Sequence, residues 1–190
     1  VLSFRKTFFG YKMHSIGIDI GSTSAKVAVI EASSGEIKEL FLRPTGWSSA
    51  DTAMLIKERV LALGLGELYF VATGYGRVSV PYADKTLTEI TCHALGAHYF
   101  CKSDCTVIDV GGQDTKAIKI ENGSVTDFTM NDKCSAGTGK FLEVMSNRLG
   151  VRFDELTHLA KNSDKDISIS SMCTVFAESE IISLIAQNVS

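Results

Sequence analysis

Two short segments with matching residue types recur ninety residues apart in this 190-residue chain. The first reads Asp19-Ile-Gly-Ser-Thr-Ser-Ala-Lys26 and the second reads Asp109-Val-Gly-Gly-Gln-Asp-Thr-Lys116. Each follows an apolar run, and each has a glutamate five residues after its lysine, at Glu31 and Glu121. A tight glycine-containing turn exposes backbone N–H groups that can hold phosphate oxygens. The repeat therefore predicts two related strand–loop–strand units that face one metal-bound phosphate ligand.

The side chains within the two loops divide into carboxylates, hydroxyls and a lysine. Carboxylates at the strand ends, Asp19 and Asp109, suit Mg²⁺, which keeps several waters and bridges to phosphates. We expect both to point into a cleft between the two halves. Glycines would let the backbone come close to the phosphate, and serine and threonine hydroxyls would donate hydrogen bonds to it. These residues are Gly21, Ser22, Thr23, Ser24, Gly111 and Gly112. Lys26 would neutralise phosphate charge, or would lie on a solvated face of its strand. A single Asp-x-Gly turn is usually a hairpin corner, and two copies in register weaken that explanation.

Two cysteines in the second half are each followed by a predicted helix. Cys134 lies in Asn-Asp-Lys-Cys-Ser-Ala-Gly-Thr-Gly-Lys, and Cys173 lies in Ser-Ser-Met-Cys-Thr-Val-Phe-Ala-Glu. A helix N-terminus favours an anionic thiolate or cluster. Two thiolates cannot complete the four-cysteine shell of an iron–sulfur cluster, but a two-fold dimer supplies four. The alternative is that each is a small buried apolar residue, the usual fate of a free cysteine. We interpret the other three cysteines, Cys92, Cys101 and Cys105, as structural.

The composition excludes several classes of protein. A net charge of −3 leaves no basic footprint for nucleic acid. No apolar run approaches the ~20 residues that cross a bilayer. Five cysteines, an odd number without a secretory leader, argue against disulfides and favour the cytoplasm. Because 45% of the residues are apolar, the chain can bury a substantial core.

The elements that position these residues follow from hydrophobic periodicity. Ile16, Ile18 and Ile20 alternate with Gly17 and Asp19, as in a strand. The patterns predict strands at 16–20, 26–30, 37–42, 68–73, 105–110, 115–120 and 124–130. They predict helices at about 53–63, 88–100, 138–149 and 153–160, and from 174 to the end.

The strand pattern restarts near residue 104, which we take as a domain boundary. Residues 13–104 then form a first domain with phosphate loop 1, and residues 105–190 begin a second with phosphate loop 2 and the cysteine pair. Residues 1–12 are an extension outside the fold. Because the second copy lacks later strand and helix units, we expect a C-terminally truncated second domain.

The ordered motifs resemble a known family. Asp19 to Lys26, Ala72-Thr-Gly-Tyr-Gly-Arg77, Asp109 to Lys116, Asn131 to Glu143 and Cys173 to Glu180 are similar to the activator ATPases of 2-hydroxyacyl-CoA dehydratases and the ATPase subunits of benzoyl-CoA reductases. This BadF/BadG/BcrA/BcrD type of ATPase belongs to the actin-like, sugar-kinase-like superfamily. The resemblance implies an α/β fold of two ribonuclease-H-like domains, with mixed sheets, a three-strand meander flanked by helices, and nucleotide between them.

The resemblance also implies roles for particular residues. ATP or ADP with Mg²⁺ would lie on the two loops, which adds Gln113 and Asp114 to the nucleotide contacts, and on a connecting motif, Gly137, Thr138 and Gly139. Catalytic roles fall to Asp19, Asp109 and Gln113. Cys134 and Cys173 would bind one 4Fe–4S cluster shared across a homodimer.

The implied activity is ATP-driven electron transfer. A reduced ferredoxin or flavodoxin would supply the electron, and a 2-hydroxyacyl-CoA dehydratase would receive it. A benzoyl-CoA-type reductase is an alternative partner. Two further alternatives are a small-metabolite kinase of the same superfamily, with Asp114 or Glu143 as its base, and a degenerate nucleotide-binding or dimerisation module that is not an enzyme.

Overall fold

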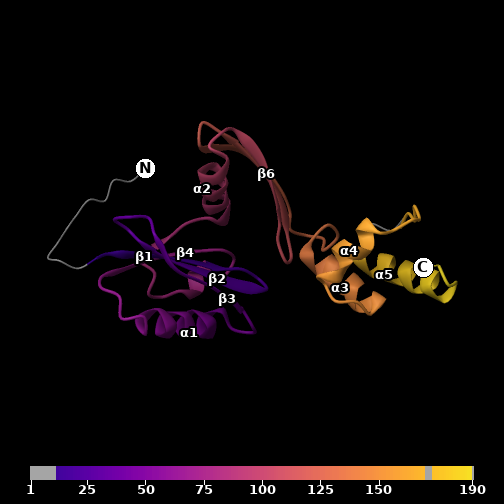
Figure 1. Ribbon diagram of the computed structural model, residues 1–190, viewed down its shortest axis with the longest axis horizontal. Coiled ribbons are helices and arrows are strands. Elements are labelled where there is room, and N and C mark those ends of the chain that lie inside the picture. The colour runs from indigo at the N-terminus through magenta and orange to yellow at the C-terminus, as the bar shows by residue number, and fades with distance from the viewer. Residues whose placement is uncertain (1–11, 170–172, 190) are drawn as a thin grey trace. The chain divides into compact units, whose positions relative to one another are not determined.

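The computed structural model describes residues 12–169 and 173–189, and it divides into two compact units between Lys102 and Ser103 (Figure 1). Both units combine an antiparallel three-strand meander with helices. The mixed α/β architecture predicted from the sequence is therefore confirmed. Among the described residues, every helix is too short or too polar to cross a lipid bilayer.

Unit 1 is built on a five-stranded sheet in the order β3-β2-β1-β4-β5. The first three strands of the chain form an antiparallel meander: β1 (His14–Ile20), β2 (Ser24–Glu31) and β3 (Ile37–Pro44). Parallel pairing then adds β4 (Leu68–Thr73) beside β1, and the two-residue β5 (Lys85–Thr86) beside β4. The sequence pattern missed β5 and the short 3-10 helix η1 (Arg77–Ser79), because both are too short to show a period.

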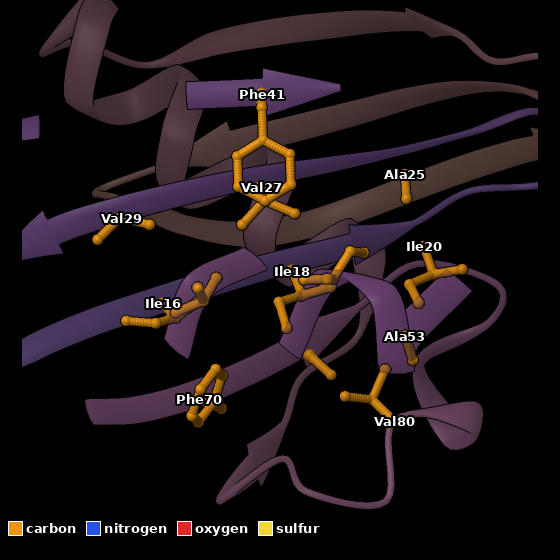
Figure 2. Close-up of a cluster of buried hydrophobic side chains, with 13 residues drawn as sticks. Ile16, Ile18, Ile20, Ala25, Val27, Val29, Phe41, Ala53, Phe70 and Val80 are labelled. Atoms are coloured by element: carbon orange, nitrogen blue, oxygen red, sulfur yellow. The ribbon is translucent and has the colours of Figure 1, made fainter. Parts of the chain in front are cut away.

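The core of unit 1 lies on one face of this sheet. Ile16, Ile18 and Ile20 of β1 are fully buried, since alternate side chains of a strand point to the same face (Figure 2). Helix α1 (Ser49–Leu61) covers them with Ala53, Ile56 and Val60. Burying each of these isoleucine and valine side chains contributes about 1.5–3 kcal/mol. Ser48 caps α1, where its side chain accepts a hydrogen bond from the Asp51 N–H at 3.1 Å.

Glu31, at the end of β2, is a buried carboxylate held by two lysines. Its oxygens lie 2.8 Å from Lys12 Nζ and 3.1 Å from Lys38 Nζ. These contacts, with Lys12 first and Lys38 second, lower the pKa of Glu31 from 4.5 to about 2. The expected extension, residues 1–12, lies outside the described residues except for Lys12, which this ion pair connects to the sheet.

Unit 1 ends with helix α2 (Glu89–Cys101). The Thr88 hydroxyl caps it by accepting a hydrogen bond from the Thr91 N–H. Lys102 adopts a left-handed conformation, φ 53°, and its N–H donates to His98 O, which ends the helix.

Unit 2 repeats the meander with β6 (Cys105–Val110), β7 (Thr115–Glu121) and β8 (Ser124–Asn131). The turn between β7 and β8 is Asn122-Gly123, where both residues have positive φ, as two-residue hairpins require. Three helices follow: α3 (Gly139–Leu149), α4 (Glu155–Lys161) and α5 (Thr174–Ala186). Helices α3 and α5 pack together through Met145, Ala177 and Ile181. Helix α5 was expected to continue to the chain end, but it stops at Ala186.

The repeat seen in the sequence is a repeat in strand register. Asp19 lies directly opposite Lys26 across β1 and β2, and Asp109 lies directly opposite Lys116 across β6 and β7. Each aspartate therefore leads into its loop from the same position of an equivalent hairpin.

Candidate functional site: two phosphate loops and a cysteine pair

Phosphate loop 1 is the turn between β1 and β2. The Gly21 N–H donates to Ser24 O at 3.1 Å, which closes the turn. Thr45, just after β3, holds the loop from the side: its hydroxyl donates to Gly21 O at 2.8 Å and its N–H donates to Thr23 O at 3.0 Å. Ser22 and Thr23 are exposed at the tip. The loop thus presents hydroxyl groups on a braced backbone.

Asp19 occupies the end of β1 with its two carboxylate oxygens in different surroundings. Oδ2 accepts a hydrogen bond from Lys26 Nζ at 3.1 Å. Oδ1 is buried and has no hydrogen-bond partner among the described residues. Such oxygens are normally satisfied by a donor, a water or an ion. A hard cation such as Mg²⁺ takes carboxylate oxygen ligands, so Asp19 fits the Mg²⁺ role.

The segment after β4 closes the back of this site. A Cβ on Gly74 would lie 2.3 Å from Asp19 Oδ1 and 2.6 Å from Ile20 O, and Gly74 has a φ of 85°. Gly76 N–H donates to Ile20 O at 2.8 Å, and Arg77 Nη1 donates to Gly74 O at 3.0 Å. Residue types alone predicted no role for Gly74. A glycine within the motif Ala-Thr-Gly-Tyr-Gly-Arg could have drawn attention to this position. Only the folded chain shows that it lies against Asp19.

Phosphate loop 2, between β6 and β7, closes in the same way as loop 1. The Gly111 N–H donates to Asp114 O at 2.8 Å, which matches the bond from Gly21 to Ser24 in the first loop. Gln113 is exposed at the tip. Asp114 stands where loop 1 has Ser24, so loop 2 carries one more carboxylate.

Lys116 is a charged residue at the start of β7, just after loop 2, for which the sequence pattern predicted no separate role. Its side chain is 2% exposed, with Nζ 2.9 Å from Asp114 Oδ2 and 3.5 Å from Asp109 Oδ2. The corresponding Lys26 side chain is 48% exposed. Lys26 therefore pairs with Asp19 while remaining half in solvent, whereas Lys116 holds two carboxylates from a buried position. The alignment of the two loop segments, which pairs Lys116 with Lys26, could have pointed to Lys116 from the sequence alone.

The connecting motif joins loop 2 to the start of α3. Gly139 N–H donates to Gly111 O at 2.8 Å, and Lys140 N–H donates to Gly112 O at 2.9 Å. Thr115 Oγ1 donates to Gly137 O at 2.6 Å. Loop 2 and the first turn of α3 therefore form one hydrogen-bonded assembly.

Thr138, expected among the nucleotide contacts, has a buried side chain. It is 1% exposed, and its hydroxyl donates to Ser135 O at 2.6 Å. Its side chain therefore braces the turn before α3.

The two cysteines differ in their relation to helices. Cys173 is the N-cap residue of α5, as expected. Cys134 is not at a helix start, because α3 begins five residues later at Gly139 and the intervening residues form a turn. Asn131 shapes that turn: its Nδ2 donates to Cys134 O at 2.9 Å, and its Oδ1 accepts from Cys134 N–H at 3.3 Å. The positive end of a helix therefore acts directly on Cys173 alone.

A hydrogen bond nevertheless connects the two cysteine segments. Ser135 follows Cys134, Thr174 follows Cys173, and their hydroxyl oxygens lie 2.8 Å apart. Both cysteines are free and exposed. The two segments that carry these exposed thiols are therefore in contact, and two thiols per chain would suit a cluster shared between subunits, in which each chain contributes half of the four thiolates.

Known proteins are similar to this chain in sequence and in fold. Residues 16–190 match the model of the BadF/BadG/BcrA/BcrD ATPase family. The (R)-2-hydroxyglutaryl-CoA dehydratase activating ATPase of Acidaminococcus fermentans is 44% identical over 92% of this chain, which spans 68% of that protein. The activator of lactoyl-CoA dehydratase of Anaerotignum propionicum is 42% identical over 94% of the chain and 70% of the relative.

A solved structure gives the same result for the fold. The activator of the 2-hydroxyisocaproyl-CoA dehydratase from Clostridium difficile, solved with bound ADPNP, superposes with a TM-score of 0.83 at 39% identity. The match covers 93% of this chain and 67% of that one. The fold is thus the actin-like ATPase fold expected from the motifs. Because the family model matches residues 16–190 and a relative is 44% identical, the chain belongs to the BadF/BadG/BcrA/BcrD ATPase family.

Proposed function

We propose that this protein is an ATP-dependent electron-transfer activator of a 2-hydroxyacyl-CoA dehydratase, with one 4Fe–4S cluster shared between two copies of the chain. Relatives at 41–44% identity are named as activators of such dehydratases. A benzoyl-CoA reductase component of Thauera aromatica is 29% identical, so a dehydratase is favoured over a reductase as the partner.

The observation that carries the proposal is the 2.8 Å hydrogen bond between Ser135 and Thr174. It joins the residues that directly follow Cys134 and Cys173, so the two segments that carry these exposed thiols are in contact. A kinase or a nucleotide-sensing module has no need for this arrangement. One chain offers two thiolates and a cluster takes four, so a second copy related by a two-fold axis completes the set.

Phosphate contacts are assigned to each loop from its own groups. Asp19 Oδ1, buried without a partner in the described chain, would take Mg²⁺ directly or through water. Asp109 is its counterpart in loop 2. Phosphate oxygens would accept from backbone N–H groups at Gly112 and from the exposed Ser22 and Thr23 hydroxyls.

The remaining residues would position rather than react. Gln113, exposed at the tip of loop 2, would orient the attacking water. The Gly139 N–H to Gly111 O bond ties loop 2 to α3, so a shift of the loop moves the turn that carries Cys134. When bound, a 4Fe–4S cluster supplies one-electron chemistry at low potential. Reduced ferredoxin or flavodoxin is the proposed electron source.

Anaerobic reconstitution of the 190-residue chain with iron and sulfide tests the proposal. We expect about two iron atoms per chain, with broad visible absorption and a mass of a dimer. Cys134→Ser and Cys173→Ser should each abolish iron binding, whereas Cys101→Ser, which alters an exposed cysteine of unit 1, should not. A wild-type chain that stays colourless and iron-free after reconstitution would refute the cluster assignment.

ATP binding is measured separately, by titration calorimetry with and without Mg²⁺. Asp19→Asn should weaken Mg²⁺-dependent binding by about tenfold or more, since it removes one charged metal ligand. Unchanged Mg²⁺ dependence in Asp19→Asn would contradict the assignment of loop 1.

A further inference from the structure

The hydrogen bond between Ser135 and Thr174, hereafter the hydroxyl clasp, connects two segments that are distant in sequence. Ser135 belongs to the turn before α3 and Thr174 is the first residue of α5. The two oxygens are 2.8 Å apart and either can donate. Thr174 is only 9% exposed, so water replaces this bond poorly. Removing the Ser135 hydroxyl would leave that of Thr174 without its partner in a largely dry position.

The clasp is itself anchored on the side of Ser135. Ser135 O accepts hydrogen bonds from the Thr138 N–H at 3.1 Å and from the Thr138 hydroxyl at 2.6 Å. The next residue, Gly139, donates to Gly111 O in phosphate loop 2 at 2.8 Å. A chain of short hydrogen bonds therefore runs from loop 2, through the turn before α3, to the first residue of α5.

On the side of Thr174, the anchor is the helix. Ala177 N–H donates to Cys173 O at 2.9 Å, so Cys173 belongs to the first turn of α5. Ala177 is fully buried in the contact with α3, together with Met145. The clasp lies at the end of this apolar contact, where it sets how closely the Cys173 end of α5 approaches the turn that carries Cys134.

We infer that Ser135 and Thr174 are positioning residues that hold Cys134 and Cys173 at a fixed separation and transmit movements of phosphate loop 2 to that pair. This inference rests on the proposed function and deepens it. It assigns the coupling between nucleotide and thiols to the hydroxyls of two residues that are neither cysteines nor assigned nucleotide contacts.

The first test needs no iron. The iron-free chain is treated with a short bis-maleimide, and the Cys134–Cys173 cross-link is quantified by mass spectrometry. Thr174→Val keeps the side-chain shape and removes the hydroxyl, and Ser135→Ala removes the other partner. We expect each to lower the cross-link yield about fivefold, and the double variant to lower it no further. Thr174→Ser restores the hydroxyl and should restore the yield.

Ser183→Ala is the matched control, because Ser183 is exposed on the same helix and its hydroxyl donates only to Ser179 O among the bonds described. Helix content from circular dichroism confirms that each variant is folded, and Ser135→Ala keeps the test decisive if Thr174→Val does not fold. Cross-link yields in Thr174→Val and Ser135→Ala equal to that of Ser183→Ala would overturn the inference.

The second test uses the reconstituted protein and measures the rate of iron loss to a chelator, with and without ADP or a non-hydrolysable ATP analogue. In wild type the nucleotide should change this rate, and in Thr174→Val the change should shrink about fivefold. A nucleotide effect of full size in Thr174→Val would overturn the coupling role. If the wild-type chain takes up no iron, the proposed function fails, while the cross-linking result still decides the role of the clasp in positioning.

Discussion

Replacing Gly74 with alanine tests the contact between the turn after β4 and the end of β1. The new Cβ would lie 2.3 Å from Asp19 Oδ1, 2.6 Å from Ile20 O and 2.8 Å from Ile20 C. Two of these atoms belong to the backbone of the central strand, so a change of side-chain rotamer cannot relieve the overlap. The φ of 85° is also unfavourable for alanine.

The expected loss of stability combines these two effects. A left-handed backbone costs a residue with a Cβ about 1–2 kcal/mol, and forcing an extra carbon into a packed site costs about 1–3 kcal/mol. Alanine recovers about 0.4–1 kcal/mol by restricting the unfolded chain. We therefore expect Gly74→Ala to lower the free energy of unfolding of unit 1 by about 2–4 kcal/mol. For a unit of this size that corresponds to a fall in Tm of roughly 8–32 °C.

Gly17→Ala is the matched control, because Gly17 lies on β1 two residues before Asp19 and a Cβ there would meet nothing within 4 Å. Its melting temperature should stay within a few degrees of wild type, as for most surface changes. Urea unfolding followed by circular dichroism measures the loss, and hydrogen exchange should place it in β1 and β4 and not in β6–β8. Equal stability of Gly74→Ala and Gly17→Ala would refute the reasoning.

Further predictions concern the ion pairs and the core. The carboxyl of Glu31 has its pKa lowered to about 2, so its ion pairs stabilise the fold fully above pH 4.5 and are lost as the pH falls toward 2. Urea midpoints of Glu31→Gln should therefore depend less on pH than wild type between pH 4.5 and 2; parallel profiles would contradict this. Lys116→Met should destabilise unit 2 by about 1–3 kcal/mol because it removes a buried cation from the partly exposed carboxylates of Asp109 and Asp114. Lys119→Met, whose exposed side chain pairs with Glu121, should cost much less. Equal losses of stability in chemical denaturation would contradict a stabilising role for the buried Lys116. Ile56→Ala should cost about 2–5 kcal/mol and Leu55→Ala, which is 44% exposed, far less, and thermal melts that reverse this order would contradict the assigned core face of α1.

Much of the fold was predictable because unit 1 and unit 2 show clear periodicity. Strands 68–73 and 105–110 were predicted with the bounds that β4 and β6 have, since both are short alternating or apolar runs ended by turn residues. The start of α3 was placed one residue early, and the start of α1 was placed four residues late. What failed were features without a period: the two-residue β5, the single turn η1, and the end of α5 at Ala186.

The site was less predictable than the fold, because its residues act through contacts between distant segments. The loops and their aspartates were visible as a repeat. Three other features of the site could not be seen in the sequence: the burial of Lys116, the closeness of Gly74 to Asp19, and the separation of Cys134 from the start of α3. Burial and long-range contact depend on which face of a strand a neighbouring element covers, and residue types alone do not state that.

The sequence by itself determined the two Asp-x-Gly hairpins, the glycines that their turns need, and the two cysteines with a hydroxyl residue after each. These features are local, since a turn depends on the conformational freedom of its own residues. Only the tertiary structure decided that the hydroxyls of Ser135 and Thr174 meet, and that loop 2 accepts hydrogen bonds at its carbonyls from the start of α3. These bonds join residues up to 39 positions apart, and the one between Ser135 and Thr174 accompanies the packing of the apolar faces of α3 and α5.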